Sequence, residues 1–324
     1  MEERTDERKG QDLRPLLEIV LVTAFSYLLY RIGIGEPFFL IPLLIFAGRR
    51  GTDVGLIPFV TMIIATAFST WFSGDFIGDF GSKLGVMLFS LQMYIPLSLL
   101  AAGIIWILGR KFGWQKRLMF SMLPSILFCL IYFLLLEHDP ALLEGVRSQY
   151  ENVFEAMLSM IVDLEAVGPE FVETLNEIFF LTLLSIVLPS ILLLICVNFF
   201  FAERSLHSRE IGFEDFVSHL ELKGWMIWIL LGSWAMVLFD RFVSFPYAVT
   251  VALFNVAICM AIVYAVQGFS VVLYRLRIKG RGMTSFGLFM LLAVISLMMP
   301  GLNFIVILGL PIIGAIESFF ELRR

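Results

Sequence analysis

The sequence predicts an all-α protein: a polytopic transmembrane helical bundle of about eight to ten spans, with both termini in the cytoplasm. Hydrophobic residues make up 59% of the chain and charged residues only 16%, whereas a soluble domain is about half apolar and about a quarter charged. The apolar residues form long continuous runs, which is typical of membrane helices rather than of β-barrel strands. The chain is therefore expected to be an integral, multi-pass membrane protein.

Ten apolar segments follow one another along the chain. They are residues 15–31, 32–48, 54–73, 84–109, 117–136, 177–202, 223–239, 246–274, 284–299 and 301–319. Residues 1–14 mix basic and acidic side chains without a cleavage site and are expected to form a cytoplasmic tail. Residues 15–324 are then a single transmembrane domain. Its second segment is the least regular, because Glu36 lies near its start and its apolar core is short.

The basic residues indicate the orientation of the spans, since Lys and Arg favour cytoplasmic loops. They gather at residues 1–14, 49–53, 110–117, 203–223, 275–281 and 323–324. With ten crossings and a cytoplasmic N-terminus, every one of these groups lies in the cytoplasm. The second segment is expected to cross for this reason, because otherwise the 110–117 loop would face outward. The expected location is the bacterial cytoplasmic membrane.

Residues 137–176 are expected to form an acidic, extracytoplasmic, amphipathic helical insertion. Its apolar residues recur every three or four positions, at Leu143, Val146, Tyr150, Val153, Met157, Met160, Leu164 and Val167. Such a helix is suited to lying on the membrane or capping the bundle, to pairing with a partner or a second copy, or to covering a substrate.

Signs of catalysis are missing from the sequence. It contains no nucleophile elbow, no P-loop and no zinc-protease motif. The three cysteines lie inside apolar runs, and the three histidines have no metal-ligand spacing. The chain is therefore expected to be no enzyme, to hold no metal or other cofactor, and to bind no nucleic acid.

Polar residues inside the spans are the candidate functional residues, since they are costly in a bilayer. They are Glu18, Gln92, Asn198, Asn255, Gln267, Asn303 and Glu317. Gln92, Asn255 and Asn303 can either hold helices together through hydrogen bonds or contact a substrate. Glu18 and Glu317 lie near span ends, where a carboxylate can reach the interface. The main candidates for in-membrane ligand contacts are Gln92, Asn255, Gln267, Asn303 and Glu317.

A basic, glycine-spaced corner joins the second and third segments. Gly51 and Gly55 are four residues apart, a spacing that lets another helix approach closely. Gly48 can end the second segment, and Arg49 and Arg50 mark the cytoplasmic side. The corner is either a tight hairpin with topological anchors or a docking or anion-binding corner.

This corner and the ending GLNFIVILGLPIIGAIESFFELRR resemble the YybS-like family of uncharacterised multi-pass bacterial membrane proteins, which carry a domain of unknown function. Gln267-Gly268 late in a long span and the terminal Glu317, Arg323 and Arg324 are consistent with that resemblance. The family is distantly similar to substrate-binding subunits of energy-coupling-factor transporters and to MreD-type cell-shape proteins. The resemblance implies a membrane subunit.

Two functions follow from these observations. The first is a transport-type subunit that binds a small molecule between its helices. The second is a structural or assembly protein of the cell envelope, similar to MreD-type proteins, with no ligand. Its expected partners are the lipid bilayer and, depending on the function, a small-molecule substrate, a membrane protein or a second copy of the chain.

Overall fold

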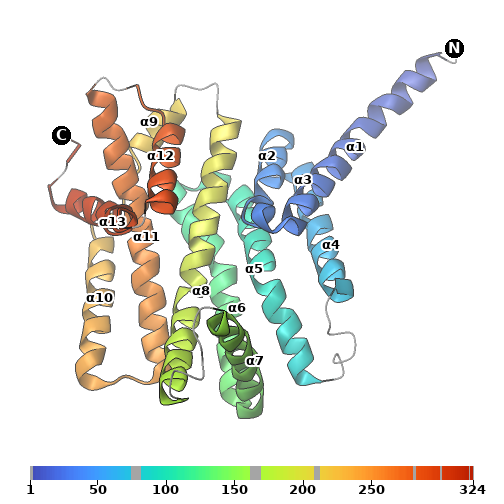
Figure 1. The fold of residues 1–324 in the computed structure, drawn as a ribbon. Helices are drawn as coiled ribbons and strands as arrows, with labels where there is room; N and C mark the ends of the chain where they lie inside the picture. Colours follow the sequence, from blue (N-terminus) through green and yellow to red (C-terminus); the bar gives the residue numbers. More distant parts are fainter. Residues whose placement is uncertain are drawn as a thin grey trace. The chain divides into compact units, whose positions relative to one another are not determined.

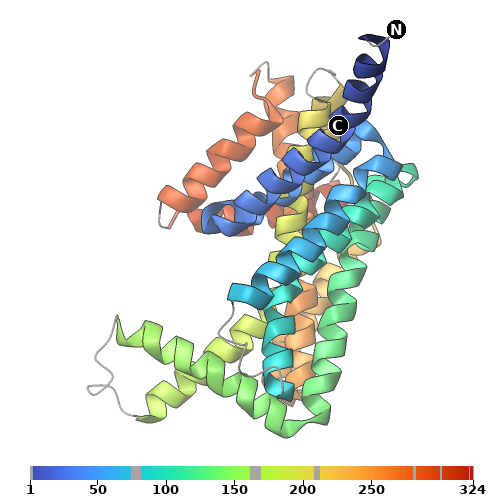
Figure 2. The ribbon, with the colours of Figure 1, turned by 90° about the vertical axis from the view of Figure 1, so that its right-hand side faces the viewer.

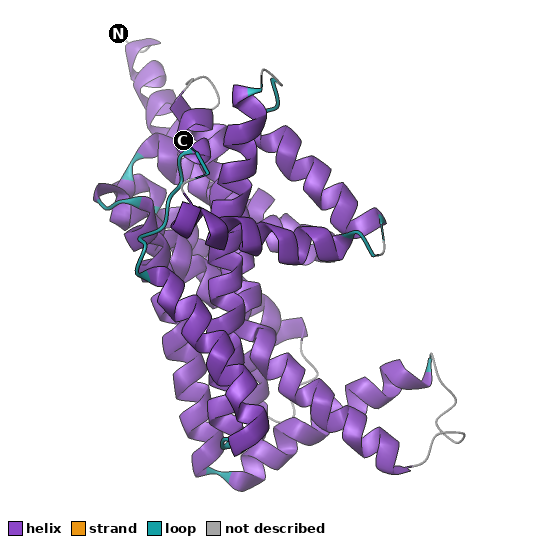
Figure 3. Cartoon of the chain, turned by 90° about the vertical axis from the view of Figure 1, so that its left-hand side faces the viewer, coloured by secondary structure: helices purple, strands orange, loops and turns teal. Residues whose placement is uncertain are grey.

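A computed structural model describes residues 3–73, 82–160, 169–207, 212–279, 282–299, 301–320 and 322–323. Helices dominate throughout this part of the chain, and it contains no strand (Figure 3). Backbone groups in a bilayer must bond within their own segment, which a helix achieves. The predicted all-α, polytopic fold class is confirmed.

Seven helices in the described residues are long and apolar enough to cross a membrane. They cover Thr52–Phe72, Lys83–Lys111, Trp114–His138, Phe171–Leu206, Met226–Val243, Tyr247–Ile278 and Asn303–Phe320. Each corresponds to one of the ten expected segments. The chain is thus a multi-pass membrane protein by the length and composition of its helices.

Three expected segments differ from these seven. Residues 15–31 belong to α1 (Glu3–Arg31), which also takes up most of the expected tail and carries charged residues at Glu18 and Arg31. Residues 32–48 are divided between the 3₁₀ helix η1 (Gly33–Phe38) and the 11-residue α2 (Leu40–Arg50). Because α2 is only about 16 Å long, it does not by itself span the roughly 30 Å of a bilayer core, and the expected crossing of this segment stays a prediction.

The ninth segment is also short as a helix. It forms α12 (Ser285–Met298), whose 14 residues extend about 21 Å, less than the roughly 30 Å of a bilayer core. α13 (Asn303–Phe320) follows it after a sharp turn, in which Gly301 has a φ of 94°. Figure 3 shows the two helices as the arms of a V. The expected break at Pro300-Gly301 includes Pro300, which lies outside the described residues.

The chain divides into two compact units. The first, unit 1, contains residues Met1–Phe180 and Leu193–Leu206, and the second, unit 2, contains Leu181–Leu192 and His207–Arg324. The long helix α8 (Pro169–Leu206) therefore contributes to both units.

In unit 1, α3 (Thr52–Gly55) and α4 (Ile57–Ser73) lead to α5 (Lys83–Leu108), η3 (Gly109–Lys111) and α6 (Trp114–His138) (Figure 1). Contacts between the basic loops place them at one end of this unit. Arg110 donates to the carbonyl of Ala47, and Arg117 pairs with Glu203. The basic groups at 49–53, 110–117 and the start of 203–223 lie together, as the charge pattern requires of loops on one side of a membrane.

At the other end of unit 1, α7 (Pro140–Ser159) and the first turns of α8 form an arm that projects from the helices (Figure 2). Asp139 caps α7, and Lys83 of α5 bonds to the same carboxylate at 3.3 Å. Phe154 stacks on Phe179 with ring centroids 4.3 Å apart. Along the predicted apolar stripe, Val146 is buried, whereas Leu143, Val153, Met157 and Met160 are exposed. Leu164 and Val167 lie outside the described residues.

Unit 2 contains α9 (Gly212–Ser218), α10 (Met226–Val243), α11 (Tyr247–Ile278), α12 and α13. Gly268 of α11 and Gly314 of α13 face the partner helix at backbone contact, since a Cβ on either would collide with a carbonyl oxygen of the other helix. Small residues at a crossing let helix backbones approach closely in a membrane. This crossing fixes the position of α13 on α11.

Candidate functional site

The middle of α8 contains a break in its backbone hydrogen bonding. Pro189 lies near the centre of the apolar run 177–202. Proline has no N–H, so it donates no helical hydrogen bond to the carbonyl of Ser185, four residues earlier. In a bilayer a neighbouring group must compensate for such a break.

Asn255 of α11 lies beside the turn of α8 that comes immediately before this break. Its amide nitrogen Nδ2 donates to the carbonyl of Leu184 at 2.8 Å, and its oxygen Oδ1 accepts from the backbone N–H of Leu188 at 3.3 Å. The same nitrogen also donates to Val251 in its own helix at 2.9 Å. Asn255 therefore bridges two backbone groups one turn apart in α8 while it is almost fully buried.

Ser185 completes this group, which we call the Pro189 turn: Leu184, Ser185, Leu188, Pro189 and Asn255. The Ser185 side chain is buried, and its Oγ has no hydrogen-bond partner in the described part of the chain. A buried hydroxyl without a partner is uncommon and costs about 1–3 kcal/mol. The Pro189 turn thus contains a hydroxyl without a partner and a carbonyl that Pro189 cannot bond to.

None of the five residues of the Pro189 turn carries a charge. Their groups can donate and accept hydrogen bonds, but they include no acid or base that could activate the Ser185 hydroxyl. Comparison of the chain with protein-family models, with curated proteins and with solved structures found no match.

The other predicted in-membrane residues do not join this site. Gln92 is exposed on α5. Asn303 begins α13, where its Oδ1 accepts from the backbone N–H groups of Gly301 at 3.1 Å and Phe304 at 2.9 Å. Gln267 follows Asn255 by 12 residues on α11, about 18 Å along a helix. Of these predicted ligand contacts, only Asn255 lies at the Pro189 turn.

Gln267 and Glu317 are buried but belong to a second region of unit 2. Gln267 accepts from the backbone N–H of Leu222 through Oε1 at 3.3 Å. Glu317 pairs with Arg323 at 3.4 Å, and Arg323 also donates to the carbonyl of Leu220 at 2.6 Å. Burial lowers the pKa of Arg323, and the charge of Glu317 opposes that shift. These contacts hold residues 220–222 and the C-terminus against α11 and α13.

The predicted corner at residues 48–55 is built from internal contacts of unit 1. Gly51 ends α2 with a φ of 85°, three residues beyond the expected end at Gly48. Gly48 instead packs against Leu206, and Gly55 lies against Ala47 so closely that a Cβ would come within 2.6 Å of its Cα. The glycines therefore allow close packing at a helix end.

The two arginines of the corner differ. Arg50 bonds to Glu18 of α1 through two nitrogens, with Nε 2.9 Å from Oε2 and Nη2 2.6 Å from Oε1. Arg49 is exposed. Arg50 is exposed as well, so the two arginines differ in that Arg50 has an ion-pair partner, Glu18.

Sequence reasoning missed a cluster around Trp106 in unit 1. Glu203 accepts from Trp106 Nε1 at 2.9 Å and pairs with Arg117 at 3.1 Å. The guanidinium of Arg117 lies 3.7 Å from the centroid of the Trp106 ring, which stacks on Phe199. Arg117 and Glu203 both sit at the ends of apolar runs, so the sequence shows them only as loop charges. The cluster joins α5, α6 and α8 by a cation–π contact and an ion pair.

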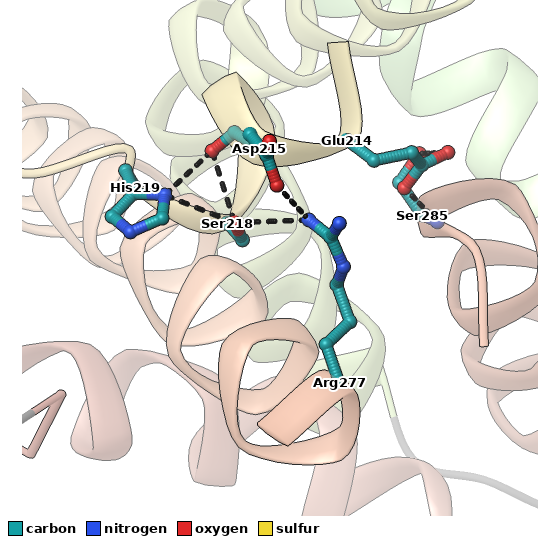
Figure 4. A network of polar contacts seen from close by, with 6 residues as sticks. All are labelled: Glu214, Asp215, Ser218, His219, Arg277 and Ser285. Atoms are coloured by element: carbon teal, nitrogen blue, oxygen red, sulfur yellow. Dashed lines mark hydrogen bonds and ion pairs between the residues drawn. The ribbon is translucent and has the colours of Figure 1, made fainter. Parts of the chain in front are cut away.

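A second missed cluster surrounds α9 (Figure 4). Asp215 pairs with Arg277 at 2.7 Å, and Glu214 accepts from the backbone N–H and the hydroxyl of Ser285 at the start of α12. The short helix α9 is thus fastened to the end of α11 and the beginning of α12.

Ser218 and His219 in this cluster resemble a nucleophile and base, with Ser218 Oγ 3.1 Å from His219 Nδ1 (Figure 4). However, Nδ1 also lies 2.8 Å from the carbonyl of Asp215, which can only accept, so Nδ1 carries the proton. A protonated Nδ1 cannot take a proton from Ser218, whose hydroxyl itself donates to the Asp215 carbonyl. This arrangement is a helix end and not a catalytic pair.

The described residues contain no group of three or more His, Cys, Asp or Glu side chains that could hold a metal ion. The three cysteines, Cys129, Cys196 and Cys259, are free of disulfides. The Pro189 turn is the candidate functional site, because a buried predicted polar residue, Asn255, bonds to the span that its proline breaks. Other mid-span prolines in the described residues also have buried, unpartnered hydroxyls nearby, Ser98 beside Pro96 in α5 and Ser121 and Ser125 beside Pro124 in α6.

Proposed function

We propose that this chain is a transport-type membrane subunit that binds a small, uncharged, polar molecule at the Pro189 turn. The observation that carries the proposal is the buried Ser185 hydroxyl without a partner, one turn before a proline in mid-span. Interrupted helices near the bilayer midplane are the usual substrate sites of transporters. The resemblance to transporter subunits supports the same function.

The geometry suggests how such a molecule would be held. Ser185 can donate and accept through its hydroxyl, and its carbonyl lacks the donor that Pro189 cannot supply. Asn255 holds the flanking groups, the carbonyl of Leu184 and the N–H of Leu188. A ligand with adjacent donor and acceptor groups would complete the hydrogen bonding of the turn. A charged ligand would find no counter-ion among these five residues.

The experiment is to incubate the purified protein with a small-molecule extract of its source cells and identify the retained molecules by mass spectrometry. We expect one stoichiometric polar ligand in the wild type and its loss in Ser185→Ala and Asn255→Ala. Asn198→Ala is the matched control, because Asn198 is equally buried but bonds elsewhere. A ligand that all three variants retain, or none in the wild type, would refute the proposal.

A second function, that of an envelope assembly protein, is favoured by α7. Leu143, Val153 and Met157 are exposed on this helix, which aromatic contacts hold in place against α8. An apolar row on an otherwise acidic arm is the kind of surface that a partner helix covers.

This second function has its own test. Cross-linking in the native membrane, followed by mass spectrometry, should identify a reproducible protein partner. The triple variant Leu143→Ser, Val153→Ser, Met157→Ser should lose that partner while it retains the ligand of the Pro189 turn. Glu144→Gln, on the same helix, is the control and should keep the partner. An unchanged cross-link in the triple variant would exclude α7 as the binding surface.

A further inference from the structure

A concave pocket of about 290 Å³ lies on unit 2 at the end of α11. Arg275 and Lys279 form part of its lining. The rest is aliphatic and comes from α11, α13 and the C-terminal turn: Val271, Val272, Leu276, Ile313 and Leu322. The pocket therefore combines two cations with apolar walls.

The order of these residues along α11 matches the layers of a membrane. Val271 and Val272 belong to the apolar run 246–274, and Arg275 and Lys279 follow it directly. Residues four apart share one helix face and differ in height by about 6 Å. The aliphatic part of the pocket thus lies at the depth of acyl chains, and the cations lie at the depth of headgroups.

The two cations of the pocket differ from their neighbour Arg277 in their ion pairing. Arg277 projects from another side of α11 and pairs with Asp215 at 2.7 Å. Arg275 and Lys279 make no ion pair with any carboxylate in the described ranges, and both are exposed. Their charges are thus available to an anion from outside the chain.

The walls of the pocket are fixed by contacts on either side of it. The backbone crossing of Gly268 and Gly314 holds α13 against α11. Arg323, next to Leu322, is tied to the carbonyl of Leu220 at 2.6 Å and to Glu317 at 3.4 Å. A ligand would therefore enter a preformed hollow, which lowers the entropic cost of binding.

We propose that this pocket binds an anionic phospholipid of the cytoplasmic leaflet. Arg275 and Lys279 contact its phosphate, and the aliphatic walls contact the first carbons of an acyl chain. Basic pockets between membrane helices on the cytoplasmic side recognise anionic headgroups in this way. The site is separate from the Pro189 turn and does not depend on the function proposed for it.

The proposal is tested on the full-length protein in detergent by native mass spectrometry with added phosphatidylglycerol or phosphatidylcholine. We expect the wild type to prefer phosphatidylglycerol. Arg275→Gln with Lys279→Gln should weaken that binding about 30-fold, because each basic residue contributes about 1 kcal/mol and about 1.4 kcal/mol is a factor of ten. Lys111→Gln with Lys116→Gln, which removes equal charge from an exposed basic loop, should leave the binding unchanged.

Two further measurements distinguish a lipid held in the pocket from a free phosphate and from attraction to basic charge alone. Val272→Phe keeps both charges but fills the hollow, so it should weaken phosphatidylglycerol binding while size-exclusion chromatography shows a folded protein. Glycerol 3-phosphate, which has the phosphate but no acyl chain, should not compete at equal concentration. Equal loss in the two charge variants, an unaffected Val272→Phe protein, or effective competition by glycerol 3-phosphate would each overturn the proposal.

Discussion

Two buried asparagines, one in each unit, make the same hydrogen bond within their own helix but bond to different kinds of neighbouring element. Asn198 of α8 and Asn255 of α11 each donate from Nδ2 to the carbonyl four residues earlier in their own helix, at 2.8 Å and 2.9 Å. Each also donates to a carbonyl of another element. For Asn198 this is Pro37 in η1, at 2.6 Å, and for Asn255 it is Leu184 in α8, at 2.8 Å.

The two asparagines differ in the element that contains this second carbonyl. Pro37 is part of the short 3₁₀ helix η1, and Asn198 donates to its carbonyl. Leu184 is part of a long helix that a proline interrupts five residues later, and Asn255 both donates to that helix and accepts from it. Asn198 thus supports η1, whereas Asn255 supports a turn of α8 that a proline weakens.

The largest expected effect comes from Asn198→Ala. The carbonyl of Pro37 would lose its donor, and a buried group without a partner costs about 1–3 kcal/mol. We expect a lower melting temperature and a free energy of unfolding reduced by about 2 kcal/mol, measured by reversible unfolding in mixed micelles. A variant as stable as the wild type would show that Asn198 does not support η1.

The second-largest expected effect is an energetic coupling between Pro189 and Asn255. Pro189→Ala restores the N–H that bonds to the Ser185 carbonyl, so the helix should need less support from Asn255. In a double-mutant cycle we expect an interaction energy of about 0.5–1 kcal/mol between Pro189→Ala and Asn255→Ala. Additive effects of the two changes would mean that Asn255 does not compensate for the proline. Pro189→Ala with Asn198→Ala is the control cycle and should be additive.

Asn255→Ala alone should have a small effect on stability. Hydrogen bonds between membrane helices contribute about 0.6 kcal/mol on average, and Leu184 and Leu188 can still bond to each other within α8. We expect a loss of about that size, clearly less than for Asn198→Ala, in the same unfolding measurement. A loss equal to that of Asn198→Ala would remove the distinction between the two asparagines.

The smallest expected effect is the pH dependence of stability that Asp139 causes. Asp139 lies at the start of the arm of unit 1 and contacts neither asparagine. A hydrogen bond from Lys83 lowers the pKa of Asp139 below its ordinary value, and backbone N–H groups at the start of α7 add to the shift. Its stabilising contribution is therefore complete above the ordinary pKa, near pH 4, and is lost as the pH falls through the lower value in the folded protein.

The measurement is thermal unfolding of the wild type and of Asp139→Asn between pH 7 and pH 2. The wild type should be slightly more stable from pH 7 to about pH 5, and the difference should close below about pH 4. The effect is small because Asp139 and Lys83 are exposed to water. A difference that persists at pH 2 would show that the charge of Asp139 is not its cause.

The comparison also shows what the sequence can predict. Both asparagines stand out in the sequence because an amide in an apolar run is costly, and Pro189 and Ser185 are visible four residues apart. Which groups meet across helices is not visible, since the register of α11 on α8 is set by packing. For the same reason Gln92 and Asn255 look equivalent in sequence, although one is exposed and the other is buried.

The bounds of the predicted spans match or differ from the helices of the structure for identifiable reasons. The long run 84–109 gives a helix close to its expected bounds, because its hydrophobic length determines it. The run 177–202 lies within a longer helix that already begins at Pro169. Residues 32–48 are divided because Pro37 and two nearby glycines favour a 3₁₀ helix, and because Asn198, far away in the sequence, supplies a bond to it. Contacts of this kind have no local signal.

The central claim is that Pro189 leaves a weak point in the backbone hydrogen bonding of α8 and that Asn255 supports it. Hydrogen–deuterium exchange of the full-length protein in nanodiscs, followed by mass spectrometry of peptides, tests it most directly. We expect residues 184–188 to exchange faster than residues 193–206 of the same helix. Asn255→Ala should accelerate exchange at 184–188 alone, while Asn198→Ala should accelerate it around residues 33–39. Uniform protection along α8, unchanged by Asn255→Ala, would contradict the account.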